Sequence, residues 1–182
     1  ISPSATSPAL STIADNGYFF RTAPSDARQG QVLAEITMER GINNVAVTFT
    51  NNDYGKGLSD SYIKAYKNLG GKVSAVVPHD EGKADYSAEV GTLDASGAGV
   101  LAVFGYVDQG GRHIIQASID SGAFDKFILA DGMYGESLLK NVDGDLTGTF
   151  GTVPGTDSEG AESFGRLAKA AGVKVGGPFT GE

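Results

Sequence analysis

The chain has 182 residues, of which 40% are hydrophobic and 20% charged, proportions that predict a folded globular domain rather than a disordered chain. Its formal net charge of −8 argues against a nucleic-acid partner, because neutralising phosphates requires clustered lysine and arginine. With no cysteine, disulfides and thiolate chemistry are excluded, and no apolar run approaches the roughly 20 residues that span a bilayer, so we expect no direct membrane insertion.

Strands and helices are expected to alternate after an irregular lead-in segment over residues 1–17, which is rich in Ser, Thr, Pro and Ala. Short apolar runs predict strands at 18–21, 45–49, 73–77, 100–104, 127–129 and 147–153. Apolar positions at helical spacing, with glycine at several helix ends, predict helices at 26–40, 57–69, 87–93, 110–121, 135–141 and 158–171.

This alternation with short connections predicts an α/β fold with a doubly wound, mostly parallel sheet. Right-handed crossovers between parallel strands then place helices on both faces of the sheet. The run 45–49 is apolar apart from one threonine, as expected of a strand that is buried on both faces.

Three loops carry a tyrosine or a carboxylate directly after an apolar strand: Tyr54, Tyr106 and Asp131. Ligands bind at the carboxyl ends of the strands in an open parallel sheet, so we expect these side chains to share one cleft. Tyrosine suits a small amphiphilic ligand, and a lone carboxylate suits a ligand ammonium. The alternative is that both tyrosines merely cover the sheet edge and Asp131 caps the next helix.

Catalytic and metal-binding patterns are weak in this sequence. His79, in an expected loop over 78–82, and His113, in an expected helix, have no partner nearby in sequence, which favours a solvated or structural role. No Gly-x-Ser-x-Gly elbow occurs. A cleft with orienting groups and no catalytic pair favours binding over turnover, so we expect no enzyme activity.

Two glycine-containing motifs resemble ligand sites only superficially. Gly55-Lys56-Gly57 lacks the spacing of a phosphate-binding loop, and a tight turn before the helix is the better interpretation. Asp143-Gly144-Asp145 lacks further oxygen donors at calcium-loop spacing and predicts a turn. We therefore expect neither a metal ion nor a cofactor.

Several pieces of sequence, occurring in order along the chain, resemble one family. They are residues 1–10, 18–22, Asp53-Tyr-Gly-Lys-Gly57, Gly105-Tyr106 and Asp131-Gly132. They resemble the branched-chain amino acid binding proteins of bacterial ABC importers, the leucine/isoleucine/valine type. The similarity spans essentially the whole chain, and the Ser-Pro-x-x-Thr and Asp-Tyr-Gly-x-Gly pieces together are fairly specific to that group.

The resemblance implies the type I periplasmic binding fold, in which two α/β lobes joined by three crossings close over a ligand. Residues 1–17 would form a hinge crossing and lead-in segment, and residues 18–182 the second lobe, truncated before the return crossings. The first lobe would precede Ile1. The expected location is the periplasm, or the outer side of the membrane in a Gram-positive source.

The resemblance also implies roles for five residues. Ser4 and Thr6 match hinge-proximal positions that touch the backbone of the amino acid ligand. Tyr54 matches an aromatic residue that covers the ligand, and Tyr106 and Asp131 match the pair that receives its α-ammonium group. The family often has glutamate where Asp131 stands, which leaves charge recognition intact but changes the geometry of the site.

The expected function is therefore that of an extracytoplasmic receptor, which binds an amino acid between its lobes and delivers it to the membrane permease subunits of an ABC transporter. A ligand-sensing type I domain of a regulator or receptor is the alternative, and sequence flanking the chain would distinguish the two. A flavodoxin-like enzyme is a third class, for which the sequence offers no catalytic pair.

Overall fold

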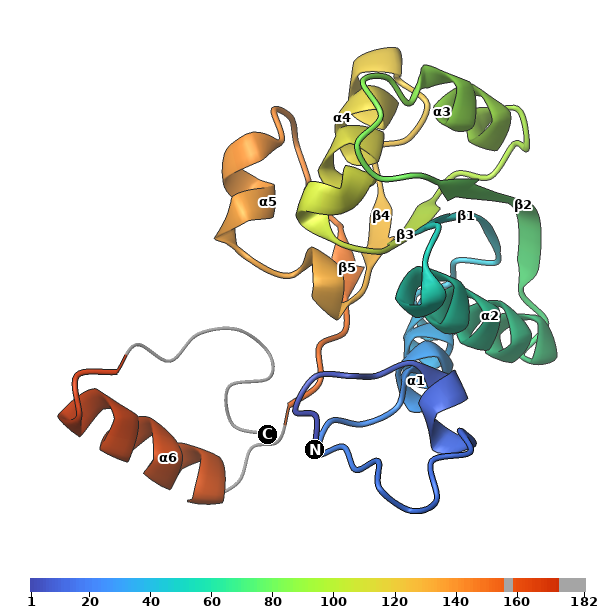
Figure 1. Cartoon of the computed structure of the whole chain (residues 1–182). Helices are drawn as coiled ribbons and strands as arrows, with labels where there is room; N and C mark the ends of the chain where they lie inside the picture. Colours follow the sequence, from blue (N-terminus) through green and yellow to red (C-terminus); the bar gives the residue numbers. More distant parts are fainter. Residues whose placement is uncertain (156–158, 174–182) are drawn as a thin grey trace.

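The buried apolar runs of this protein assemble into a parallel sheet in the computed structural model, which describes residues 1–155 and 159–173. Five strands lie in the order β2-β1-β3-β4-β5, and every neighbouring pair is parallel (Figure 1). The strands are β1 (Asn44–Thr50), β2 (Lys72–His79), β3 (Leu101–Phe104), β4 (Phe127–Leu129) and β5 (Phe150–Gly151). The predicted doubly wound α/β fold is thus confirmed.

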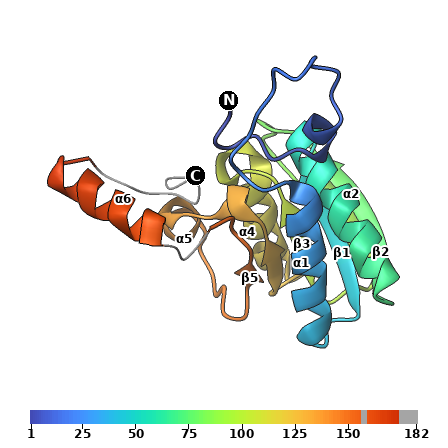
Figure 2. The ribbon, with the colours of Figure 1, turned by 90° about the horizontal axis from the view of Figure 1, so that it is seen from below.

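Helices cover both faces of the sheet, and successive residues of a strand alternate between the two faces. Side chains of α1 (Asp26–Glu39) and α2 (Asp53–Asn68) pack with Val45 and Val47 on one face. Side chains of α3 (Ser87–Asp94), α4 (Arg112–Ser121) and α5 (Glu136–Asn141) pack with Ala46 and Leu101 on the other. Helix α6 (Glu159–Ala170) lies apart from the sheet in both views (Figures 1 and 2).

The predicted strand at 18–21 is wrong. This segment is irregular, and its only ladder contact is an isolated bridge between Ser2 and Arg21. The side chain of Arg21 instead donates to the backbone carbonyls of Ala5, Thr6 and Ser7, which ties the segment to the chain's first residues. Away from the main sheet, the apolar run has no strand beside it in the described part of the chain.

The predicted loop at 78–82 is also wrong at its start, because Pro78 and His79 belong to β2 and pair with Phe49 and Thr50 of β1. Strand β2 lies at the edge of the sheet, where proline is tolerated because one side of the strand needs no ladder hydrogen bond.

Helix α2 begins at Asp53, four residues before the predicted start at Gly57. The side chain of Asn52 accepts a hydrogen bond from the Gly55 backbone N–H at 2.9 Å and thereby caps the helix. Gly55, Lys56 and Gly57 therefore lie inside the helix rather than in the predicted tight turn. Lys56 pairs there with Asp60 at 2.7 Å.

The remaining elements match their predictions within a few residues, with two local differences. The predicted helix at 110–121 is preceded by η2 (Val107–Gly111), a wide turn of π-helix type in which Gly110 adopts a φ of 99°. The strand predicted over 147–153 contains only two paired residues, those of β5. The predicted helix 158–171 corresponds to α6. Position 158 of that prediction, and positions 174–182 of the predicted lobe 18–182, lie outside the described residues.

Candidate ligand-binding site

The structure brings together the three side chains that follow the apolar strands. Tyr54 lies in the first turn of α2 after β1, Tyr106 lies two residues beyond the end of β3, and Asp131 begins the short helix η3 (Asp131–Met133) after β4. The Tyr54 hydroxyl donates to Asp131 Oδ1 at 2.8 Å, and the rings of Tyr54 and Tyr106 lie 4.8 Å apart. The predicted convergence at the carboxyl edge of the sheet is therefore observed.

Asp131 is a largely buried carboxylate, only 6% exposed, whose two oxygens have different surroundings. Oδ1 accepts hydrogen bonds from Tyr54 and from Gln29 Nε2, both at 2.8 Å. No described residue donates a hydrogen bond to Oδ2. One oxygen thus anchors the side chain, while the other remains available to a donor from a ligand.

The capping role considered for Asp131 does not account for the geometry. Asp131 makes no side-chain capping hydrogen bond to η3, so it is not the helix cap of the alternative interpretation. Tyr106 is 40% exposed, although its ring contacts Tyr54. A half-open aromatic ring next to a buried carboxylate is suited to a small ligand that carries a cation.

The two phenols remain protonated at neutral pH. Burial, reinforced by the charge of Asp131, raises the pKa of Tyr54 far above its usual value. Burial raises the pKa of Tyr106 as well, and the charge of Asp131 adds to that shift. Tyr54 therefore acts as a hydrogen-bond donor to the carboxylate.

Glycines allow the loops of the site to approach each other closely. A Cβ atom on Gly132 would lie 2.2 Å from the carbonyl oxygen of Gly105, and one on Gly55 would lie 2.3 Å from that of Thr50. The backbone N–H of Gly132 also donates to the Tyr54 hydroxyl at 3.2 Å. The Asp-Gly and Asp-Tyr-Gly motifs therefore meet requirements of packing as well as of chemistry.

A second buried carboxylate, Asp26, lies beside this cluster at the start of α1. The sequence pattern indicated it only as the first residue of a helix. It is 0% exposed, and neither carboxylate oxygen has a hydrogen-bond partner of normal geometry. Burial raises the pKa of Asp26 to about 7; the nearby Thr6 side chain opposes this rise, and the charge of Asp131 adds to it. At neutral pH this group therefore stands close to its titration midpoint.

Sequence reasoning also missed Gln29, which lies one helical turn after Asp26 on α1. Its side chain joins Asp131 to the Thr152 backbone carbonyl, at 2.8 Å and 3.1 Å respectively. Residues at i and i+3 on a helix share one face. The spacing of an acidic residue and an amide in the first turn of α1 is therefore the pattern that could have indicated Asp26 and Gln29 as site residues.

The two hinge-proximal residues differ in their surroundings. Thr6 is buried, and its carbonyl accepts a hydrogen bond from the Asp26 backbone N–H at 2.9 Å, which places it next to the cluster. Ser4 is exposed, and no hydrogen bond among the described residues joins it to Tyr54, Tyr106 or Asp131. The contacts of both residues with a ligand stay predictions.

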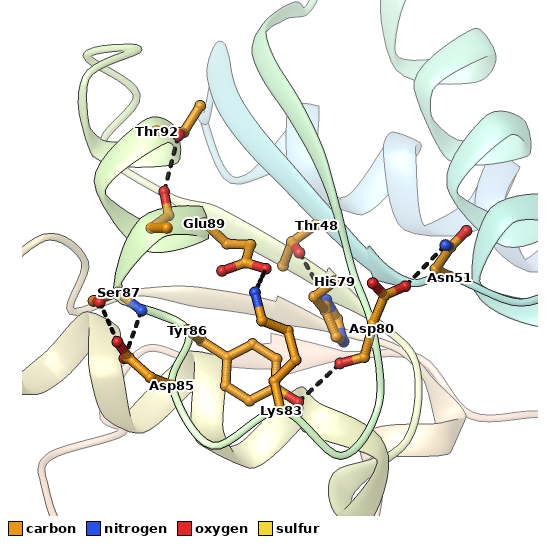
Figure 3. Close-up of polar contacts among 11 residues, drawn as sticks. Thr48, Asn51, His79, Asp80, Lys83, Asp85, Tyr86, Ser87, Glu89 and Thr92 are labelled. Carbon is orange, nitrogen blue, oxygen red and sulfur yellow. Dashed lines mark hydrogen bonds and ion pairs between the residues drawn. The ribbon is translucent and has the colours of Figure 1, made fainter.

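The two histidines lie on the opposite side of the sheet from α1 and α2. His79 is buried, 1% exposed, and both ring nitrogens lie within hydrogen-bonding distance of threonine hydroxyls, so of the two predicted roles the structural one holds. Figure 3 shows its contact with Thr48. His113 is exposed and stacks on Tyr86 with ring centroids 6.0 Å apart.

Other kinds of site find little support within the described parts of the chain. No group of three or more His, Asp or Glu side chains there is arranged to hold a metal ion. The backbone bends at Gly144, and Asp145 accepts a hydrogen bond from the Thr147 N–H at 2.8 Å, in agreement with the predicted turn. Among residues 1–155 and 159–173, none of the helices combines the length and apolar character needed to cross a bilayer.

The fold and the sequence together define the class of protein. Residues 1–179 match the family of periplasmic binding proteins, so the chain belongs to that family. A leucine-binding protein, LivK, from Thermotoga maritima has a similar fold, with a TM-score of 0.79 and 20% sequence identity over 98% of this chain and 51% of its own. The family and the fold are those of binding proteins, and the match covers one lobe of a type I periplasmic binding protein.

Two further relatives are similar over parts of the sequence. A Leu/Ile/Val-binding protein homologue of Brucella melitensis biotype 1 is 36% identical over 116 residues, which cover 61% of this chain and 30% of that protein. An uncharacterised protein of Methanocaldococcus jannaschii is 29% identical over 103 residues, covering 54% of this chain and 25% of that protein. The matched regions thus span a third or less of the length of these relatives.

Proposed function

We propose that this chain is the second lobe of an extracytoplasmic receptor that binds a zwitterionic amino acid through its α-ammonium group. One observation carries the proposal: Asp131 is buried and anchored through Oδ1, while its Oδ2 receives no donor from the described residues. Oδ2 is not among the fully buried unpaired atoms, so a ligand can reach it, and a cationic donor would pair there with a carboxylate that is otherwise largely desolvated.

The ammonium group of an amino acid suits this site because it carries three donors and a positive charge. It would donate to Asp131 Oδ2 and lie against the faces of Tyr54 and Tyr106, where cation–π attraction adds to the charge pair. Asp26 supplies a second negative charge nearby once it loses its proton. Ser4 and Thr6 would contact the ligand backbone from the hinge segment, residues 1–17.

A branched-chain or similar apolar amino acid is the proposed ligand. Support comes from two similar proteins, the Leu/Ile/Val-binding protein homologue of Brucella and the leucine-binding protein of Thermotoga. In the proposed receptor, residues 18–182 form the second lobe, and a first lobe supplies the opposite wall. Closure of the two lobes would present the ligand to the permease subunits of an ABC transporter without any chemical step.

The proposal is tested by calorimetric titration of the two-lobe receptor with leucine as the probe. Replacing Asp131 by asparagine is expected to weaken binding by about 2–5 kcal/mol, because the ligand ammonium loses its charged partner in a desolvated site. The exposed Asp125→Asn variant removes one negative charge elsewhere and serves as the matched control. An unchanged dissociation constant for Asp131→Asn, or tight binding of a ligand without an ammonium group, would contradict the proposal.

A further inference from the structure

A buried histidine lies next to the strand that leads into the ligand site. His79, at the end of β2, has Nδ1 2.8 Å from Thr48 Oγ1 and Nε2 3.1 Å from Thr50 Oγ1. Both threonines belong to β1 and are buried. Figure 3 shows the His79 ring next to Thr48, with a dashed line marking their hydrogen bond.

The surroundings of His79 keep its ring neutral at neutral pH. Burial lowers the pKa of His79 to about 4, although the charges of Glu89 and Asp80 oppose the shift. Lys83, which lies over the Tyr86 ring, is paired with Glu89, and the Tyr86 ring stands edge-on with its centroid 6.1 Å from that of His79. A neutral imidazole has one donor nitrogen and one acceptor nitrogen, so its tautomer matters.

Hydrogen bonds continue from Thr50 into the turn that follows Tyr106. The Thr50 hydroxyl donates to the backbone carbonyl of Gln109 in η2 at 3.5 Å, the long end of the hydrogen-bonding range. Because that hydroxyl proton is used there, Thr50 must accept from His79 Nε2–H, and Nδ1 then accepts from Thr48. The contacts around Thr50 thus favour the Nε2–H tautomer.

The same turn is linked to the helix that carries Tyr54. The Asn52 side chain donates to Gln109 Oε1 at 3.4 Å and also accepts from the Gly55 N–H as the cap of α2. Gly110 permits the close approach, since a Cβ atom there would lie 2.9 Å from His79 Cδ2. His79 is therefore linked through Thr50 to η2, which follows Tyr106, and η2 is linked through Asn52 to the first turn of α2, which carries Tyr54.

We propose that His79 is a positioning residue for the ligand site, and that its Nε2–H group orients the Thr50 hydroxyl toward η2 and so holds Tyr106 against Tyr54. This role rests on the proposed amino acid binding function and adds to it a residue that does not touch the ligand. If His79 only filled space in the core, the loss of affinity would follow the loss of side-chain volume, and Thr50→Val, which keeps the volume but removes the hydroxyl, would bind as the wild type does.

Two replacements separate the nitrogens of the ring. Glutamine places its amide close to the position of Nε2, and asparagine places its amide close to that of Nδ1. With leucine as the probe and the two-lobe receptor, His79→Asn is expected to weaken binding about tenfold, roughly the effect of one lost hydrogen bond, and His79→Gln to keep affinity within about twofold. Thr50→Val should behave as His79→Asn does, and Thr50→Ser as the wild type.

His113→Gln is the matched control, because His113 is the exposed histidine that stacks on Tyr86. A double-mutant cycle between His79→Asn and Tyr106→Ala is expected to be non-additive for affinity, since the histidine acts through the tyrosine. Equal losses in the glutamine and asparagine variants, or additive effects in the cycle, would overturn the positioning role.

A measurement without ligand decides the role independently. In the ligand-free receptor, nitrogen NMR is expected to show His79 as the Nε2–H tautomer. The backbone N–H groups of Gln109 and Gly111 both donate to the Tyr106 carbonyl at 3.2 Å. Their amide hydrogens should exchange with solvent faster in His79→Asn than in His79→Gln. The Nδ1–H tautomer, or equal exchange in the two variants, would refute the role. Failure of the wild type to bind leucine would instead count against the proposed function alone.

Discussion

The folded lobe disfavours the charged form of Asp26. Its two carboxylate oxygens are buried without a hydrogen-bond partner, and its pKa rises from 3.8 to about 7. Between these two values the folded state keeps a proton that the unfolded state has already released. By linkage, the contribution of Asp26 to stability is most favourable near pH 4 and falls as the pH rises toward 7.

Replacing Asp26 by asparagine should therefore stabilise the chain in a pH-dependent way. We expect the free energy of unfolding at pH 8 to rise by up to about 4 kcal/mol, and the change at pH 4 to stay below about 1 kcal/mol. Urea unfolding at the two pH values measures the difference, and Asp125→Asn serves as the exposed control. An equal effect at both pH values would show that Asp26 does not titrate as described.

At the scale of elements, the site depends on how closely the segments after β3 and β4 approach each other. Gly132 at the start of η3 lies against the carbonyl of Gly105, with no space for a side chain between them. This contact brings Asp131 within hydrogen-bonding distance of the Tyr54 hydroxyl. The position of Tyr54 in turn depends on the start of α2 at Asp53. Short apolar strands thus fix the place of the site, and glycine contacts fix its geometry.

The Gly132→Ala variant tests this dependence. Because the new Cβ atom would lie 2.2 Å from a backbone oxygen, the two segments must separate, and we expect a loss of roughly 1–3 kcal/mol in stability. Denaturant unfolding measures the loss, and weaker leucine binding by the two-lobe receptor should accompany it. Gly99→Ala is the matched control, since a Cβ atom at Gly99 meets nothing within 4 Å. A loss no larger than that of the control would mean that the segments adjust freely.

At the scale of the whole molecule, the lobe has the core of an independent folding unit but only one wall of the proposed cleft. Hydrophobic clusters lie on both faces of the sheet, each formed by helices and strands of this chain alone. A lobe of this size can bury enough apolar surface to fold by itself. Tyr106, in contrast, remains 40% exposed at the site.

We therefore expect the 182-residue chain to unfold cooperatively on heating yet to bind amino acids poorly or not at all. A receptor that closes over its ligand derives affinity from both walls, and the opposite wall would be missing. Circular dichroism melting tests the folding, and titration calorimetry with leucine tests the binding. Micromolar binding of leucine by the isolated chain would show that one lobe suffices.

Much of the fold was predictable because it follows from local patterns. Apolar runs of strand length identified all five strands of the sheet, and apolar residues at helical spacing identified its helices. The errors in these elements lie mainly at their ends. The convergence of Tyr54, Tyr106 and Asp131 followed from topology, since parallel strands share a carboxyl edge. The start of α2 was missed because the Asn52 cap determines it. The end of β2 was missed because its pairing with β1 determines it.

The sequence by itself determined the layered α/β architecture and the edge of the sheet where a ligand would bind, because both depend on residue spacing and chain connectivity. Tertiary structure alone decided which groups meet there. Gln29 and Asp131 are 102 positions apart, and His79 was expected in a loop, with a solvated or structural role, yet belongs to β2 and is buried against β1. Burial and hydrogen bonding between distant segments depend on the packed chain, and no local period in the sequence records them.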